Sequence, residues 1–307
     1  MPANPLGSEA ALSWNLMADL HQLFGYHFMH TAFLAGTLIA LVAGAVGYVM
    51  VLRGQSFAGH TLAQVGFAGA AGAVLVGVPP VVGLLLFAIA AALGIGTLGE
   101  HSPQTGWGQE LAIGSVLTCA LGLGLLFVRL ASVNAAGVYA LLFGAVLGIS
   151  DQDVWIIALT ALVTLVGLAI IARPLLFASL DPEVAEARGV PVRGLTMAFL
   201  VLLAVAVAEA VQVVGVLLIF ALLVTPAAIA QQLTVRVAAG VSLSILLALL
   251  FTWGGLAVAY FTTYPAGFFI TTMAFATYTL VRLLRLIRVR LARRSRASVA
   301  RELAGPL

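Results

Sequence analysis

Apolar runs near the length of a membrane-crossing helix dominate this sequence. A helix needs roughly 20 predominantly apolar residues to cross the hydrocarbon core of a bilayer. The runs that approach this length lie at about 31–52, 60–78, 80–98, 111–128, 154–173, 195–212, 213–230, 237–260 and 266–286. A further apolar segment, 135–150, is too short to cross alone and could form a re-entrant half-helix.

Composition points to the same class of protein. Hydrophobic residues make up 63% of the 307 positions, and charged residues make up only 8%, against about 25% charged in a typical soluble domain. This excludes a soluble enzyme, a nucleic-acid-binding domain and a disordered scaffold. Helices satisfy their own backbone hydrogen bonds in lipid, so the sequence predicts an all-α integral membrane protein, a bundle of eight or nine transmembrane helices. The single Cys119 excludes a disulfide framework.

The arginines predict how the chain is oriented. All 14 basic residues are arginines, and eight of them lie within 282–301. The positive-inside rule places this tail in the cytoplasm. Counting back through the spans places 262–265 outside and both 231–236 and 175–194 inside. If the segment 135–150 does not cross the membrane, the turn at Arg53 also lies inside.

Three segments follow from this orientation: an extracytoplasmic segment 1–30, a transmembrane domain 31–286 and a basic cytoplasmic tail 287–307. Residues 1–30 contain no Lys or Arg, so no secretory signal is predicted. A basic tail could bind nucleic acid, but a juxtamembrane basic helix is more often a topology anchor or a contact to lipid headgroups. We therefore predict membrane lipid, and not nucleic acid, as a partner.

The polar segment 173–194 contains the signals of a short helix. Asp181 is placed to cap it and Pro182 to occupy its first position, while Gly189 followed by Pro191 is a stop signal. An amphipathic linker lying on the membrane surface would explain the same composition.

Three blocks of sequence resemble one known family. They are "LDPEVAEARGVPV" in the polar segment, "VVGVLLIFALLVTPAAIAQQL" at 213–233, and "YVMVLRGQSFAGHTLAQVGFAGAAGA" at 48–73. Together they resemble the metal-ion permeases of ATP-binding-cassette (ABC) importers, and the resemblance runs from about 28 to 280. The second block is similar to the signature span of that family, with Gly215, Thr225 and Pro226 at the matching places.

This resemblance implies a homodimeric permease of the bacterial cytoplasmic membrane. It also implies a cytoplasmic ATPase subunit on each protomer and an extracytoplasmic metal-binding protein as partners. The chain has no phosphate-binding G-x-x-x-x-G-K-[ST] motif, so ATP hydrolysis is expected in the separate subunit. The short polar helix then corresponds to the coupling helix that meets the ATPase, formed by Asp181, Pro182, Glu183, Glu186, Arg188 and Gly189.

The second span carries the first candidate metal ligands. Members of the resembled family carry an Asp and, four residues later, a His at its start, and such a pair faces one side of a helix. The matching residues here are His60 and Gln64. Histidine suits zinc, but the missing carboxylate lowers the charge of the site. The two side chains could instead only hydrogen-bond between helices, although polar groups inside a membrane usually face a cavity.

Glu209 is the acid of an otherwise apolar span, with Gln212 one turn later. An ionisable residue within a membrane is by default a candidate functional residue. Glu209 could supply the carboxylate that the second span lacks, forming one metal site with His60 and Gln64. Alternatively, it lies near the outer end of its span and is simply hydrated.

Other candidate ligands lie outside the spans. His21, His27 and His30 precede the first span, and the last two share a helix face on which they could capture a zinc ion. Asp151 and Asp153 could attract cations, or they could cap the helix that follows. Histidines without any role are common at surfaces.

The function predicted from the sequence is that of a permease subunit that imports a divalent transition metal, zinc before manganese, by alternating access. The altered His60 and Gln64 pair leaves open a non-metal or metal-chelate substrate in the same architecture. A gradient-driven secondary transporter, which would work without any ATPase, is the alternative from another class.

Overall fold

The computed structural model of the chain describes residues 26–99, 107–130, 144, 148–262 and 264–303, except for the side chains of 107–109, 217 and 289–303. All regular secondary structure within these residues is helical. The described helices are α2 (His27–Leu52), α3 (Ser56–Val76), α4 (Pro80–Gly99), α5 (Trp107–Leu130), α7 (Asp151–Leu180), α8 (Pro182–Ala187), α9 (Val192–Val214), α10 (Val216–Leu233), α11 (Val237–Tyr260) and α12 (Ala266–Leu303).

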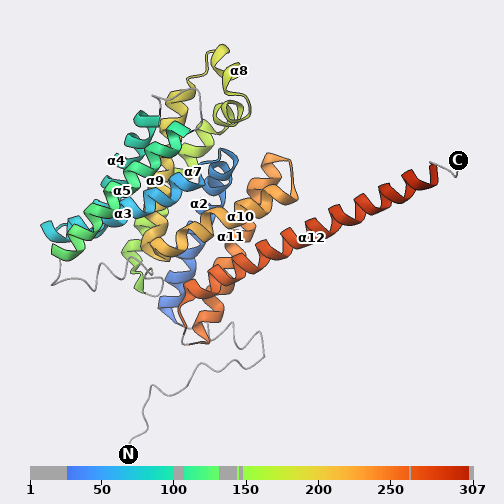
Figure 1. Ribbon diagram of the computed structural model, residues 1–307. Helices are drawn as coiled ribbons and strands as arrows, with labels where there is room; N and C mark the ends of the chain where they lie inside the picture. The colour runs from blue at the N-terminus through green and yellow to red at the C-terminus, as the bar shows by residue number, and fades with distance from the viewer. Residues whose placement is uncertain (1–25, 100–106, 131–143, 145–147, 263, 304–307) are drawn as a thin grey trace, which may run out of the picture.

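Most of these helices match the predicted spans. Eight described helices are long and apolar enough to cross a membrane, and α10 is apolar but shorter. The prediction of an all-α bundle is therefore confirmed. In Figure 1, α8 lies at one extremity of the molecule, while α12 runs out of the bundle to the C-terminus.

Local signals in the sequence set several helix boundaries. Ser150 and Asp153 form a reciprocal capping box at the start of α7. Gly77 ends α3 with a φ of 74°, and Gly215 separates α9 from α10 with a φ of 88°. Both values lie in the region that favours glycine because a Cβ is strained there.

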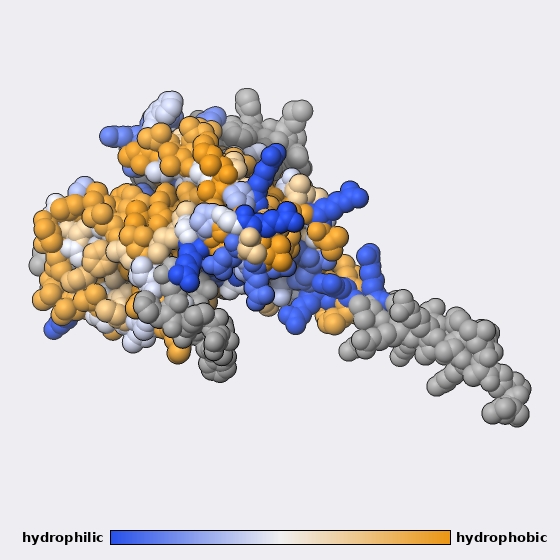
Figure 2. All heavy atoms as spheres, turned by 90° about the horizontal axis from the view of Figure 1, so that it is seen from above, coloured by the Kyte–Doolittle hydropathy of each residue, from blue (hydrophilic) through white to orange (hydrophobic). Residues whose placement is uncertain are grey.

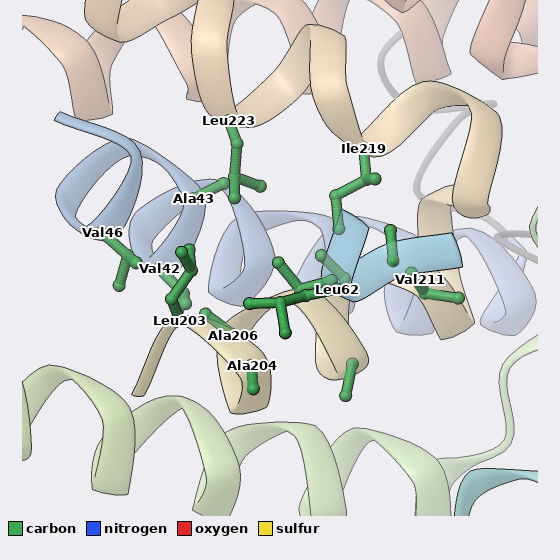
Figure 3. Packing of buried hydrophobic residues seen from close by; sticks show 14 of the residues in the cluster. Val42, Ala43, Val46, Leu62, Leu203, Ala204, Ala206, Val211, Ile219 and Leu223 are labelled. Carbon is green, nitrogen blue, oxygen red and sulfur yellow. The ribbon is translucent and has the colours of Figure 1, made fainter. Parts of the chain in front are cut away.

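The centre of the bundle is formed by α2 and α9, whose spans are mostly buried within the chain, whereas less than a quarter of each span is buried in α5, α7 and α12. Figure 3 shows Val42, Val46 and Leu203 of these two central helices packed together, with Leu62 of α3 and Ile219 of α10 beside them. Small residues allow the helices to approach closely, as expected in a membrane bundle.

Gly44 and Gly47 show how close this approach is. A Cβ on Gly47 would overlap the carbonyl oxygen of Leu223 in α10, and a Cβ on Gly44 would overlap the backbone of Ile245 in α11. Ser244 donates a hydrogen bond of 2.9 Å to the Gly44 carbonyl oxygen. These two glycines therefore fix the distance from α2 to both neighbouring helices.

The turns between helices gather at two ends of the bundle. At the α8 end, Arg53 hydrogen-bonds to Thr196, and Gln231 donates to the Tyr48 carbonyl oxygen at 3.1 Å. At the opposite end, Tyr26 lies against Tyr260 with ring centroids 6.2 Å apart. This grouping agrees with the prediction that 175–194 and 231–236 lie on one side of the membrane and 262–265 on the other. The assignment of either end to the cytoplasm stays a prediction.

The segment predicted to be re-entrant, 135–150, lies largely outside the described residues. The flanking helices are nevertheless placed. Near the end of α5, Phe127 lies beside Gly72, which is close to the end of α3, and α7 begins at Asp151 beside His27. Helix α5 therefore ends and helix α7 begins at the same end of the bundle.

The outer surface is largely apolar. Figure 2 shows hydrophobic side chains over much of the bundle and hydrophilic ones concentrated toward the side where α12 leaves it. Helix α12 continues through the basic run to Leu303, beyond the end of the span predicted at 286. Leu, Arg and Ala favour helix, and residues 287–303 contain neither Gly nor Pro.

Candidate functional site

His60 and Gln64 lie on one side of α3, and both side chains are half-buried. The turn before α3 includes Gly54, whose φ is 69°. The imidazole ring of His60 packs edge to face with the phenyl ring of Phe220 in α10, with ring centroids 5.7 Å apart and an interplanar angle of 84°. Among the described residues, neither His60 nor Gln64 makes a hydrogen bond to another helix. Their donor atoms therefore remain available to a ligand.

Glu209 has a different neighbour. Only 2% of its surface is exposed, and its carboxyl group lies beside Thr160 of α7. The Thr160 hydroxyl donates to the Ile156 carbonyl oxygen at 2.9 Å, and neither carboxyl oxygen of Glu209 has a hydrogen-bond partner within the described residues. Glu209 is thus buried within the chain and not hydrated at a surface in this conformation.

Helix geometry explains why Glu209 faces α7. Leu202 precedes it by two helical turns and therefore shares its face, and a Cβ on Gly167 of α7 would lie 2.9 Å from Leu202. His60, in contrast, contacts α10. In this conformation, His60 lies against α10 and Glu209 lies beside α7. The single metal site predicted from His60, Gln64 and Glu209 stays a prediction.

The chain alone supplies few metal ligands in any one place. No group of three or more His, Cys, Asp and Glu side chains placed to hold a metal ion occurs within the described residues. Within the described residues, His60 and Gln64 therefore do not belong to a group of three or more such ligands.

Two of the candidate ligands outside the spans meet each other. His27 Nε2 lies 3.0 Å from Asp151 Oδ2, and both side chains are exposed. Asp153 instead accepts from the Ser150 backbone N–H at 3.1 Å, so its role as a helix cap is confirmed. His30 lies one turn after His27 in α2. His21 lies outside the described residues.

Helix α8 has the capped form that the sequence predicted. The Asp181 side chain accepts a hydrogen bond of 3.1 Å from the Val184 backbone N–H, and Pro182 occupies the first helical position. Gly189 ends the turn with a φ of 79°. Ala185 of this helix is fully buried, whereas the predicted coupling residues are all exposed: Asp181, Pro182, Glu183, Glu186, Arg188 and Gly189.

The residues of the signature span lie in and before α10. Gly215 makes the break that precedes the helix, Thr225 is half-buried and Pro226 is buried. The contact of Leu223 with Gly47 places this helix directly against α2.

Two features of the site were not predicted from the sequence. One is the contact of Phe220 with His60, and the other is a set of hydrogen bonds from Arg53 to α7 and α9. The partners of Arg53 lie more than a hundred residues away along the chain, so no local pattern indicates them.

Residues 25–285 match the ABC 3 transport family. The chain belongs to the ABC 3 transport family. The matched range begins just before α2 and ends within α12. Helix α8 and the break at Gly215 therefore both lie within the part of the chain that matches the family.

Named relatives are also similar. The manganese transport system membrane protein MntC of Listeria innocua serovar 6a is 34% identical over 71% of this chain and 76% of its own length. The manganese import system permease protein ScaB of Streptococcus parasanguinis is 32% identical over 67% of this chain and 72% of its own. PsaBC from Streptococcus pneumoniae, solved in complex with Fab, has a chain that shares 28% identity, with a TM-score of 0.76 over 86% of this chain and 94% of that one.

Proposed function

We propose that this chain is the permease subunit of an ABC importer that moves a divalent transition metal across the bacterial cytoplasmic membrane. Helix α8 carries the proposal. It is a capped helix between two spans, it buries only Ala185 against the bundle and it exposes its other residues. A short polar helix held in this way is suited to receive a partner protein, and the family match supports an ATPase as that partner.

The substrate follows from the relatives and from the donor atoms. Five of the most similar relatives are named for manganese transport or import. Imidazole and amide groups bind both manganese and zinc, with imidazole better suited to zinc. The names of the relatives therefore shift our proposal from zinc to manganese, with His60 and Gln64 as ligands along the path.

A second copy of the chain would supply the missing donors. One chain contributes His60 and Gln64, and a two-fold axis would bring the same pair from the partner, since a symmetric dimer uses the same surface on both copies. Phe220 beside His60 is 43% exposed in the single chain, which supports an interface or a cavity at this place. We therefore propose a homodimer with its metal path between the protomers.

The transport cycle would run by alternating access. ATP-driven closure of the two ATPase subunits would move the α8 helices together, and α7 and α9, which α8 joins, would carry the movement into the membrane. At the opposite end, His27 and Asp151 would receive the metal from an extracytoplasmic binding protein.

The test combines uptake with assembly. Cells that lack other importers would express the chain with its ATPase, and radiolabelled manganese and zinc uptake would be measured with and without the ATPase. Gly189→Trp and a deletion of 181–189 should leave the permease in the membrane but abolish co-purification of the ATPase. The deletion removes the helix that the ATPase would bind, and the tryptophan places a bulky side chain on the exposed surface directly after it. We expect manganese uptake that requires the ATPase.

Gly77→Trp is the matched control. Gly77 also has a positive φ, 74°, and a Cβ there would meet no atom within 4 Å, as at Gly189, but it lies at the opposite end of the bundle. This variant should keep the ATPase bound. Full ATPase stoichiometry in Gly189→Trp and in the deletion would refute the coupling role of α8, and uptake without any ATPase would support a gradient-driven transporter instead.

A further inference from the structure

Arg53 joins three parts of the chain at the α8 end. It lies in the turn between α2 and α3, and its side chain is half-buried. Nη1 donates to Ser179 Oγ at 2.9 Å, Nη2 to Thr196 Oγ1 at 2.8 Å, and Nε to Gln55 Oε1 at 3.4 Å. The guanidinium carbon also lies 5.7 Å from the centre of the Phe199 ring.

The two hydroxyl groups are oriented to accept from Arg53. Ser179 donates its own proton to the Leu175 carbonyl oxygen, and Thr196 donates its proton to the Val192 carbonyl oxygen. Each hydroxyl oxygen therefore presents lone pairs to the guanidinium. Ser179 lies in the last turn of α7 and Thr196 near the start of α9, so the two hydrogen bonds hold the two helices between which α8 lies.

Arg53 differs from an arginine that only sets topology. Within the described residues it has no carboxylate partner, and burial lowers the pKa of its guanidinium because a cation loses solvation there. Arg188 and Arg193, at the same end, are exposed to solvent. Keeping a cation partly buried among neutral acceptors costs free energy, and Arg53 could avoid that cost by pointing into water.

We infer that Arg53 is a positioning residue that couples α8 to the metal path. It fastens the helices on both sides of α8 to the turn from which α3 starts. His60 follows in the second turn of α3 and Gln64 one turn later. When the ATPase displaces α8, Arg53 pulls the start of α3 and moves these two ligands, so metal release is tied to the ATPase cycle.

A guanidinium suits this role better than an ammonium. Its planar fork presents separate N–H groups to two acceptors at once, whereas lysine offers one compact point charge. Lysine keeps the charge but carries its three donors on a single nitrogen, so we expect it to lose the fork geometry that reaches Ser179 from Nη1 and Thr196 from Nη2. Arg53→Lys separates the bridging role from the charge.

This inference rests on the proposed function, and its test uses the whole complex of permease and ATPase in proteoliposomes with the binding protein inside. Arg53→Lys and Thr196→Val would be compared with wild type for ATPase binding, ATP hydrolysis and ⁵⁴Mn²⁺ transported per ATP. We expect the ATPase to stay bound and active while metal transported per ATP falls by about tenfold, the effect of losing one charge-assisted hydrogen bond.

Matched controls exist for both variants. Arg236 is an exposed arginine at the same end, so Arg236→Lys keeps the charge without touching the bridge. Thr118 donates to the carbonyl oxygen four residues earlier, as Thr196 does, but receives no bond from an arginine. Arg236→Lys and Thr118→Val should transport the wild-type amount of metal per ATP.

The double variant Arg53→Lys with Thr196→Val gives the decisive comparison. If both residues act through one bridge, the double variant should lose no more coupling than Arg53→Lys alone. Wild-type metal per ATP in Arg53→Lys, or additive losses in the double variant, would overturn the inference. Failure of the wild-type chain to bind the ATPase would instead refute the proposed function, so the two failures are distinguishable.

Discussion

His27 Nε2 lies 3.0 Å from Asp151 Oδ2 and joins the first residue of α2 to the first residue of α7. The two side chains keep 77% and 68% of their surface exposed. An exposed pair of this kind contributes about 1 kcal/mol or less to stability. The imidazole and carboxylate together are, however, a suitable pair of ligands for a divalent metal.

Removing this pair should therefore affect metal capture more than stability. We expect His27→Ala and Asp151→Asn to lower manganese uptake at limiting concentration while leaving thermal unfolding in detergent almost unchanged. Ser150→Ala is the control. It removes the α7 cap, should cost about 1 kcal/mol of stability, and should leave the concentration dependence of uptake unaltered. Normal uptake by both pair variants at limiting metal would argue against a capture site.

Variants of His60 test whether its ring contacts the transported metal. His60→Ala should remove most radiolabelled manganese and zinc uptake without reducing expression or ATPase binding. His60→Asp should restore uptake and shift preference from zinc toward manganese, since carboxylates favour harder cations. Wild-type uptake by His60→Ala would mean that the imidazole only packs against Phe220 and is not a metal ligand.

Glu209 can be tested separately from His60. Glu209→Gln keeps the shape of the side chain but removes a negative charge that could offset a cation. We expect it to reduce manganese uptake more than Gln212→Ala, which removes an amide that donates to the Ala208 carbonyl oxygen of its own helix. Because Glu209 is buried against α7 in this conformation, such a loss would also indicate that α7 and α9 separate during transport. Equal uptake by the two variants would assign Glu209 to packing.

Gly47 tests the close packing of the bundle. Gly47→Ala would place a methyl group against the Leu223 carbonyl oxygen and should destabilise the protein by about 1–3 kcal/mol, as overpacking does. Gly94 lies inside α4, and a Cβ there meets no atom within 4 Å. Gly94→Ala should be neutral or slightly stabilising. Thermal unfolding in detergent measures both, and equal melting temperatures would contradict the close approach of α2 to α10.

The predicted orientation can be read from thiol labelling. In a Cys119→Ser background, Ala300→Cys should resist an impermeant thiol reagent applied to intact cells, because the arginine-rich tail is expected inside. Tyr264→Cys, in the turn at the opposite end, should react rapidly. The reverse pattern would invert the proposed topology.

The sequence was sufficient for features that depend on local chemistry. Asp181, Pro182 and Gly189 define α8 through capping and a positive φ, and each acts within its own turn. The apolar runs define the spans because the bilayer sets their length. Helix α12 continues beyond the predicted span to Leu303, because Leu, Arg and Ala still favour helix after the membrane ends.

The contacts of the candidate site could not be predicted in the same way. Most spans are apolar on every face, so no hydrophobic stripe indicates which side of a helix faces the bundle. Whether His60 meets Phe220, or Glu209 meets α7, depends on the rotation of each helix about its axis. Packing between helices distant in sequence sets that rotation. Small residues such as Gly44 and Gly47 allow a close approach, but the sequence does not indicate which helix approaches them.

The central position of α2 also has a consequence for biogenesis. This helix packs mainly against α11, α10 and α7 and very little against α3, its successor in the chain. During synthesis α2 therefore enters the bilayer before the helices that it packs against most have been made. The packing around α2 is completed only when α10 and α11 are inserted. A nascent chain arrested before them should therefore hold its first helices in the membrane with Gly44 and Gly47 of α2 still exposed to lipid and to quality-control proteases.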